Sequence, residues 1–245
     1  AVVSQPQAEN IPHILVADTR AALGAFAKNY YALFGALTVR VTGSVGKTTT
    51  KELIAAVLAK KYETAKTAGN FNNEIGLPLT IFNIREEHEV AVLEMGINHF
   101  EEMHRLTKMA QPDICVITNI GYCHLEYLND RDGVLKAKTE MFDFMQPGAK
   151  IILNGDDDKL ITVGETKGSV PKFFGLSPEH DGFATDIHSK SLKGIECTLH
   201  FGDNNVNVYI AVFFAILIYY THRSNIKRLL NGTENKFGSK KEKQQ

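Results

Sequence analysis

A glycine-rich stretch near residue 45 combines the residue types that bind the phosphates of a nucleotide. Its sequence is Thr42-Gly43-Ser44-Val45-Gly46-Lys47-Thr48-Thr49-Thr50. Glycines let backbone N–H groups approach phosphate oxygens, a lysine at this spacing reaches the β- and γ-phosphates, and the next hydroxyl can bind Mg²⁺. The sequence therefore predicts a phosphate-binding loop whose nucleotide contacts come from Gly43, Ser44, Val45, Gly46, Lys47, Thr48 and Thr49.

The residues on both sides of this loop predict the elements that must hold it. Residues 37–41 are β-rich, and residues 51–60 are apolar at helical spacing with good helix formers. Strand, glycine loop and helix in this order distinguish a phosphate-binding loop from a chance glycine turn. One position departs from the general pattern, which has a glycine where this chain has Val41.

Polar side chains end three other predicted strands. The apolar run 89–96 contains Glu94, whose carboxylate beside a phosphate loop suits Mg²⁺, although an ordinary acid at a strand end is the alternative. The strand 113–119 ends in Asn119. The strand 62–67 is followed by a loop that is either solvated or binds a ligand at the carboxyl edge of the sheet. Its polar candidates are Asn70, Asn72 and Asn73.

Three more features each have two interpretations. Cys123 and His124 are adjacent as zinc ligands can be, but no second ligand pair stands at metal spacing. Lys138 lies close to the apolar stripe of a predicted helix, where it either extends its ammonium to water or has a function. The acidic run 156–158 resembles a metal loop but is better explained as the start of a helix at Lys159.

The element pattern predicts an α/β fold: a phosphate-binding, doubly wound, mostly parallel sheet with helices on both faces. Strands are expected near 37–42, 62–67, 89–95, 113–119 and 149–154, and helices over 18–36, 100–109 and 130–145. Residues 1–12 are expected to be a loose end. After residue 170, short, partly alternating segments predict a β-rich extension (170–202), either an antiparallel edge or a small β-sheet appended to the α/β core.

Bulk composition narrows the class of protein. The chain has 245 residues and a net charge of −1, which argues against a dominant nucleic-acid role. Three scattered cysteines and the lack of a signal peptide suggest a cytoplasmic protein. The apolar run 208–220 is too short for a membrane helix, so no stable membrane insertion is expected. It precedes a basic end, and 223–245 carries seven Lys/Arg and two Glu. The Asn231-Gly232-Thr233 glycosylation pattern has no meaning without secretion, and 238–245 should be disordered.

Five ordered motifs together resemble the Mur ligase family. They are T-G-S-V-G-K-T-T-T, T-A-G-N-F-N-N-E-I-G-L-P, L-E-M-G, T-N-I-G-Y-C-H-L-E and K-A-K-T-E-M-F. The most similar type joins D-Ala-D-Ala to a UDP-N-acetylmuramoyl-tripeptide in peptidoglycan precursor synthesis. The resemblance implies that 1–35 is a remnant of an N-terminal domain with a linker helix and that 36–205 is the central ATP-binding domain. It also implies that 206–245 is foreign to the family and that the chain is truncated at both ends.

The resemblance also implies roles for particular residues. Lys47 would hold the phosphates of ATP, and Thr48 and Glu94 would bind Mg²⁺. His124 matches the family histidine near a second Mg²⁺, and Lys138 matches a lysine that is carbamylated in related ligases to make an anionic metal-side ligand. Lys47, His124 and Lys138 would thus be the catalytic set. The muramoyl substrate and nucleotide would contact Asn70, Asn72, Asn73 and Asn119.

Two other functions stay open on the sequence alone. The chain can be a non-catalytic fragment that binds ATP and Mg²⁺, because the flanking domains of the family are missing. It can also be a related ligase such as a folylpolyglutamate synthase, although the Asn-rich loop and L-E-M-G-I-N favour the peptidoglycan type. A membrane-tethered protein, held by residues 208–220 and the basic tail, is a weaker third alternative.

Overall fold

The computed structural model describes residues 1–5, 11–189, 194–202 and 204–211. The chain divides into two compact units, residues 1–183 and 184–245. The predictions for 212–220, for the glycosylation pattern at 231–233 and for the tail at 238–245 lie outside the described residues.

The first unit is built on a parallel sheet, as predicted. Its strand order is β8-β7-β6-β3-β5-β4, and every neighbouring pair is parallel. The strands are β3 (Leu37–Thr42), β4 (Thr64–Lys66), β5 (Val90–Glu94), β6 (Ile114–Ile117), β7 (Lys150–Asn154) and β8 (Lys172–Gly175). Since parallel strands share one carboxyl edge, the residues that follow β3, β5 and β6 meet there.

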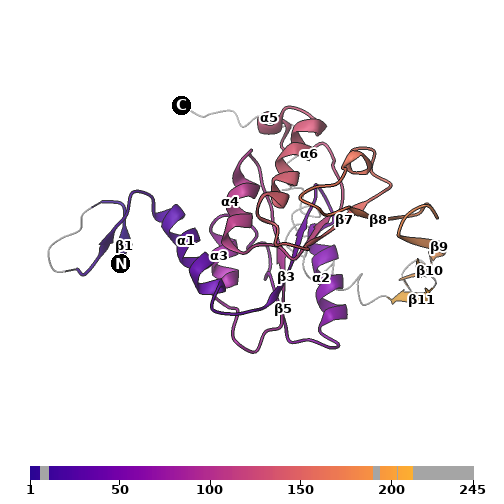
Figure 1. Ribbon diagram of the computed structural model, residues 1–245, viewed down its shortest axis with the longest axis horizontal. Coiled ribbons are helices and arrows are strands. Elements are labelled where there is room, and N and C mark those ends of the chain that lie inside the picture. Colours follow the sequence, from indigo (N-terminus) through magenta and orange to yellow (C-terminus); the bar gives the residue numbers. More distant parts are fainter. Residues whose placement is uncertain (6–10, 190–193, 203, 212–245) are drawn as a thin grey trace, which may run out of the picture. The chain divides into compact units, whose positions relative to one another are not determined.

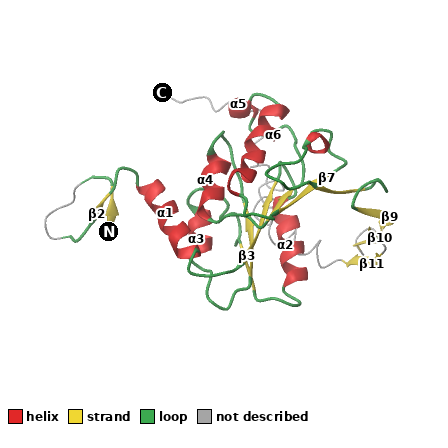
Figure 2. Ribbon diagram, viewed as in Figure 1, coloured by secondary structure: helices red, strands yellow, loops and turns green. Residues whose placement is uncertain are grey.

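The sheet is covered on both faces, which confirms the doubly wound architecture. Alternating residues of one strand enter different cores: Ala91 and Leu93 of β5 face one, and Val90 and Val92 face the other. Helix α2 (Lys47–Leu58) covers the second face, where Ala55 packs. Helices α1 (Thr19–Tyr31), α3 (Gly76–Ile81), α4 (Glu102–Met109) and α6 (Arg131–Thr139) lie on the other side (Figures 1 and 2). The 3₁₀ helices are η1 (Glu140–Phe144) and η2 (Leu160–Thr162).

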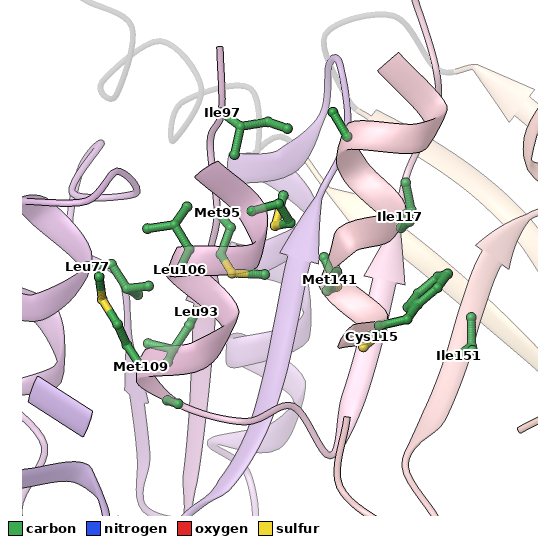
Figure 3. Close-up of a cluster of buried hydrophobic side chains, with 14 of the residues drawn as sticks. Leu77, Leu93, Met95, Ile97, Leu106, Met109, Cys115, Ile117, Met141 and Ile151 are labelled. Carbon is green, nitrogen blue, oxygen red and sulfur yellow. The ribbon is translucent and has the colours of Figure 1, made fainter. Parts of the chain in front are cut away.

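The larger core explains the helical spacing in the sequence. Met103, Leu106 and Met109 of α4, spaced at helical intervals in the predicted helix 100–109, are buried, and Leu106 packs in the same cluster as Leu93 of β5. Figure 3 shows Leu106 and Met109 of α4 beside Leu77, Leu93 and Met95. These apolar contacts hold α4 against the strand that ends in Glu94.

Several boundaries differ from the sequence expectation. The first helix, capped by Asp18, ends at Tyr31 and not at 36, because the N–H groups of Leu33 and Phe34 bond the carbonyls of Tyr30 and Tyr31 in tighter turns that end the helical pattern. The expected loose N-terminus contains a short parallel pair, β1 (Val2–Val3) and β2 (Ile14–Leu15). Helix α5 (Leu125–Leu128) was not predicted.

The extension after residue 170 is not antiparallel from its start. Strand β8 pairs with β7 in parallel, and Gly182 and Phe183 of β9 (Gly182–Ser189) pair with β8 in parallel. Residues 155–171 form a crossover long enough to return the chain to the same edge. The expected antiparallel pairing does occur in the second unit, between β10 (Gly194–Phe201) and β11 (Asn204–Ala211). The first residues of the apolar run 208–220 therefore belong to a strand.

The central strand carries a buried cation that the sequence did not flag. The side chain of Arg40 is fully buried; it donates to the carbonyl of Ala110 and to the sulfur of Met95, while its Nε has no partner. Burial lowers the pKa of Arg40 to about 10, and no carboxylate of the described residues forms an ion pair with it. A buried charge without a paired anion is a cost to the fold.

Replacing Arg40 with Met should therefore raise the free energy of unfolding by about 2 kcal/mol, since relief of charge burial outweighs the two lost hydrogen bonds, to Ala110 and Met95, of ~1 kcal/mol each. Urea unfolding of the full chain measures this, with Arg40→Lys as the matched control that keeps a charge and should give no gain. A Met variant less stable than the parent would show that the guanidinium contacts outweigh its desolvation.

Candidate nucleotide-binding site

The loop between β3 and α2 has the backbone shape that its glycines permit. Gly43 has φ 152° and Gly46 has φ 80°, and Gly46 is the residue before the first turn of α2. A Cβ at Gly43 would lie 1.9 Å from the hydroxyl oxygen of Thr118, so only glycine fits there. Val41 is buried within β3 and packs in the core that α2 covers, which explains why this position has no need of glycine.

The end of β6 fixes the loop in place. The side-chain oxygen of Asn119 accepts hydrogen bonds from the N–H groups of Ser44 and Val45, both at 3.0 Å. The hydroxyl of Thr118 donates to the carbonyl of Val45 at 2.7 Å. The N–H of Gly121 donates to the Ser44 hydroxyl oxygen at 2.8 Å. Asn119, predicted to lie near substrate and nucleotide, is thus a direct support of the loop.

The first turn of α2 presents the charge that a phosphate needs. No side chain caps this turn, so its N–H groups and the positive end of the helix dipole face the loop. Lys47 is half-buried and its Nζ donates to the carbonyls of Gly43 and Ser44, at 2.9 and 3.4 Å. Thr48 and Thr49 follow in the same turn and are also partly accessible.

Glu94 lies beside this loop with one oxygen unused. Its Cα is the register partner of Val41, and its side chain is only 2% exposed. Oε1 accepts a hydrogen bond from Asn72 at 2.8 Å, while the buried Oε2 has no hydrogen-bond partner. An unsatisfied carboxylate oxygen, next to a phosphate loop, suits Mg²⁺, which prefers oxygen ligands.

Cationic groups gather at the same edge of the sheet. Lys138 is 2% exposed, so its ammonium does not extend to water. Burial lowers its pKa to about 8; Cys123 opposes this shift, and the nearby Lys47 adds a smaller lowering effect. The pKa of His124 is lowered first by burial and then by the charges of Lys138 and Lys47. The three predicted catalytic residues therefore lie within electrostatic reach of one another.

The remaining candidates have local partners. Asn73 accepts from the N–H groups of Ile75 and Gly76 in the turn just ahead of α3, while Asn70 is exposed. Cys123 donates to the hydroxyl of Ser44 at 3.1 Å. Asp157 accepts from Lys159 and Leu160 N–H groups, as expected for an acidic run that starts a helical turn. In the described part of the chain, no group of three or more His, Cys, Asp or Glu could hold a metal ion.

The sequence analysis missed two residues of this site. Thr118 was treated only as part of a strand end, although a hydroxyl before Asn119 is a signal for a loop support. Lys51 was treated as an ordinary helix former. Its position one turn after Lys47, in line with the buried Ala55, could have indicated that it faces the sheet.

Known proteins resemble this chain in both sequence and structure. The sequence matches the family model described as Mur ligase middle domain over residues 41–214. This chain belongs to the Mur ligase family. It is 41% identical over 196 residues to UDP-N-acetylmuramoyl-tripeptide–D-alanyl-D-alanine ligase of Bacillus subtilis, covering 78% of this chain and 42% of that protein.

Solved structures agree with the assignment. The Mur ligase fold seen here is similar to MurF from Acinetobacter baumannii, with a TM-score of 0.77 and 30% identity over 98% of this chain and 55% of that one. It is also similar to the MurF ligase of Thermotoga maritima in complex with ADP, with a TM-score of 0.78, 27% identity and coverage of 96% and 54%. The chain spans about half the length of the relatives it matches. Within its described residues, no helix combines the length and apolar character needed to cross a bilayer.

The buried amine of this Mur ligase domain gives a pH prediction. Since the pKa of Lys138 is about 8 in the folded chain and 10.5 as its ordinary value, the unfolded chain binds more protons between these pH values. A Lys138→Met variant should therefore be more stable than the parent at pH 7. Its advantage should shrink as pH rises from 8 to 10.5, by on the order of 3 kcal/mol in total.

Urea unfolding of both proteins across this pH range, in buffer freed of CO₂ so that the amine of Lys138 stays unmodified, measures the difference. Lys136→Met, which removes an exposed lysine two positions away, is the matched control and should show no such slope. A constant difference between the Lys138→Met variant and the parent would mean that Lys138 is not a free buried amine in solution.

Proposed function

We propose that this chain is the ATP-binding part of a ligase that joins D-Ala-D-Ala to a UDP-N-acetylmuramoyl-tripeptide. The observation that carries the proposal is the unused oxygen of Glu94 beside a phosphate loop, with Lys47, His124 and Lys138 at the same edge. The names of the relatives supply the two substrates. The proposed domain limits are 1–35, a remnant of an N-terminal domain with a linker helix, and 36–205, the central domain; the family match over 41–214 runs past residue 206, where a segment foreign to the family was expected to start.

The reaction needs two steps in which anions are brought together. The terminal carboxylate of the peptide attacks the γ-phosphorus of ATP, ADP leaves, and an acyl phosphate forms. The amine of D-Ala-D-Ala attacks the acyl carbon, loses a proton and displaces inorganic phosphate to leave an amide. Lys47 and the N–H groups of α2 offset the charge on the phosphates in the first step. The use of ATP and a nucleotide-linked precursor supports a cytoplasmic reaction.

The site fits magnesium as the metal cofactor. Thr48 and Glu94 would hold Mg²⁺, which when bound neutralises charge on the phosphate oxygens. The lowered pKa of His124 keeps its ring neutral at pH 7, the form that can ligate a second ion. Asn72 orients Glu94 by its hydrogen bond, and Asn70, Asn73 and Asn119 belong to the loops around it.

Lys138 is proposed to carry a carbamate. Its pKa of about 8 leaves much more neutral amine at neutral pH than an exposed lysine has, and the neutral amine is the form that reacts with CO₂. The product replaces a buried cation with an anion near Lys47 and His124. Native mass spectrometry would find the added mass of one CO₂ in the parent and not in the Lys138→Met variant.

Calorimetry of ATP and Mg²⁺ with the full chain tests the nucleotide site. Lys47→Ala should weaken binding about tenfold or more, equal to ~1.4 kcal/mol, because the phosphates lose their closest cation. Lys60→Ala removes an exposed lysine just beyond α2 and should bind like the parent. Equal binding by the parent and the Lys47→Ala variant would reject this loop as the phosphate site.

A product assay separates a ligase from the second candidate, a non-catalytic protein that binds ATP and Mg²⁺. The chain, mixed with both substrates and with the separately purified flanking domains of the Bacillus subtilis relative, should form the amide product by mass. Omission of ATP or substitution of Lys47 by Ala should abolish it. Nucleotide binding without product in every mixture would favour the second candidate.

A further inference from the structure

A second lysine of α2 lies on the side of the helix that faces the sheet. Lys51 is fully buried, one helical turn after Lys47. Its Nζ donates to the carbonyl of Thr67 at 2.7 Å and lies 2.9 Å from Oε1 of Glu52. Two anchors on different elements therefore fix the position of this ammonium.

The same ammonium approaches the oxygen of Glu94 that has no hydrogen bond. Lys51 Nζ lies 3.9 Å from Glu94 Oε2, inside ion-pair distance and beyond hydrogen-bond distance. The other oxygen is held by Asn72, and the Glu94 N–H donates to the hydroxyl of Thr67. Lys51 and Glu94 are thus both attached to Thr67, and the charge on Oε2 is compensated while its lone pairs remain available.

We infer that Lys51 is a positioning residue for Glu94: its buried ammonium, fixed by Thr67 and Glu52, holds the carboxylate in place as a metal ligand without a hydrogen bond to the oxygen that binds the metal. The inference rests on the proposed function, because it takes Glu94 to bind Mg²⁺. It assigns α2 two separate tasks on one face of the helix: Lys47 in the first turn serves the phosphates, and Lys51 one turn later serves the carboxylate of Glu94.

The charge of Lys51 and its positioning of Glu94 have opposite expected effects on metal affinity, so a measurement of metal binding can test the inference. A fixed ammonium repels a divalent cation, so loss of Lys51 would tighten metal binding if repulsion were its main contribution. It would weaken metal binding if positioning of Glu94 were the main contribution. A purely structural lysine would change stability and leave metal affinity as it is.

Electron paramagnetic resonance measures the binding of Mn²⁺ to the full chain saturated with ADP. Calorimetry separately measures the affinity of the chain for ADP in the absence of metal. Lys51→Met should weaken Mn²⁺ binding about tenfold or more and leave metal-free ADP affinity within about twofold. The matched control is Lys66→Met, because Lys66 pairs with the same Glu52 but not with Glu94. It should behave like the parent.

A double-mutant cycle shows whether Lys51 acts through Glu94. Glu94→Gln should weaken Mn²⁺ binding by itself, and Lys51→Met should then add little. Unchanged or tighter Mn²⁺ binding in Lys51→Met, or full additivity of the two substitutions, would overturn the inference.

Two further outcomes remain decisive. If Lys51→Met does not fold, Glu94→Gln in the same chain should restore folding, because it removes the uncompensated buried carboxylate; failure to restore it overturns the inference. If the Glu94→Gln variant binds Mn²⁺ as tightly as the parent, the proposed metal site is wrong, and the inference is wrong with it. If Glu94→Gln weakens Mn²⁺ binding but Lys51→Met does not, the metal site stands and only the inference is rejected.

Discussion

The phosphate loop depends on the pairing of β3 with β6. The loop is short and glycine-rich, and on its own it would sample many shapes. The end of β6 removes that freedom, since the side chain of Asn119 accepts hydrogen bonds from two loop N–H groups and the hydroxyl of Thr118 donates to a loop carbonyl. Because the register of the two strands places Thr42 beside Ile117, these contacts follow directly from the sheet. The loop is therefore shaped before any nucleotide arrives, and binding need not order it.

Positive charge is concentrated at the carboxyl edge of the sheet, which suits the binding of a polyphosphate. Lys47 and Lys138 lie close together, and both burial and mutual repulsion weaken the charged form of Lys138. Glu94 is the buried acid among them and is itself shared with Lys51. Close lysine charges lower the stability of the fold, and the binding of anions between them offsets this cost. Active sites commonly lower stability in this way for the sake of function.

The local parts of this structure could be predicted from the sequence, and the non-local parts could not. Strand β3, its loop and α2 are contiguous, so composition and spacing define them. Glu94 and Asn119 were found because each ends a buried apolar run. In contrast, the Asn119 contact joins residues far apart in the chain, and no periodicity indicates it.

The elements that the sequence did not predict correctly also depend on contacts between distant parts of the chain. The Asn-rich stretch was expected to be a loop, but it leads directly into α3, where the side chain of Asn73 accepts from the N–H of Gly76 and Pro78 is compatible with the first helical turn. His124 adopts a left-handed conformation ahead of α5, which residue type alone did not suggest. The parallel pairing of β8 depends on the length of its crossover and the edge left open by β7. Burial of Arg40 and Lys51 is likewise decided by the packing of neighbouring elements.

The outer strand β4 has a consequence for association between chains. An edge strand exposes unpaired N–H and C=O groups that a strand of another molecule can extend into an aggregate. Here the edge is only Thr64–Lys66, and the ammonium of Lys66 is held against Glu52 of the adjacent helix. A three-residue edge that ends in a lysine gives an incoming strand little to pair with. The same lysine that neutralises Glu52 therefore also discourages growth of the sheet beyond β4.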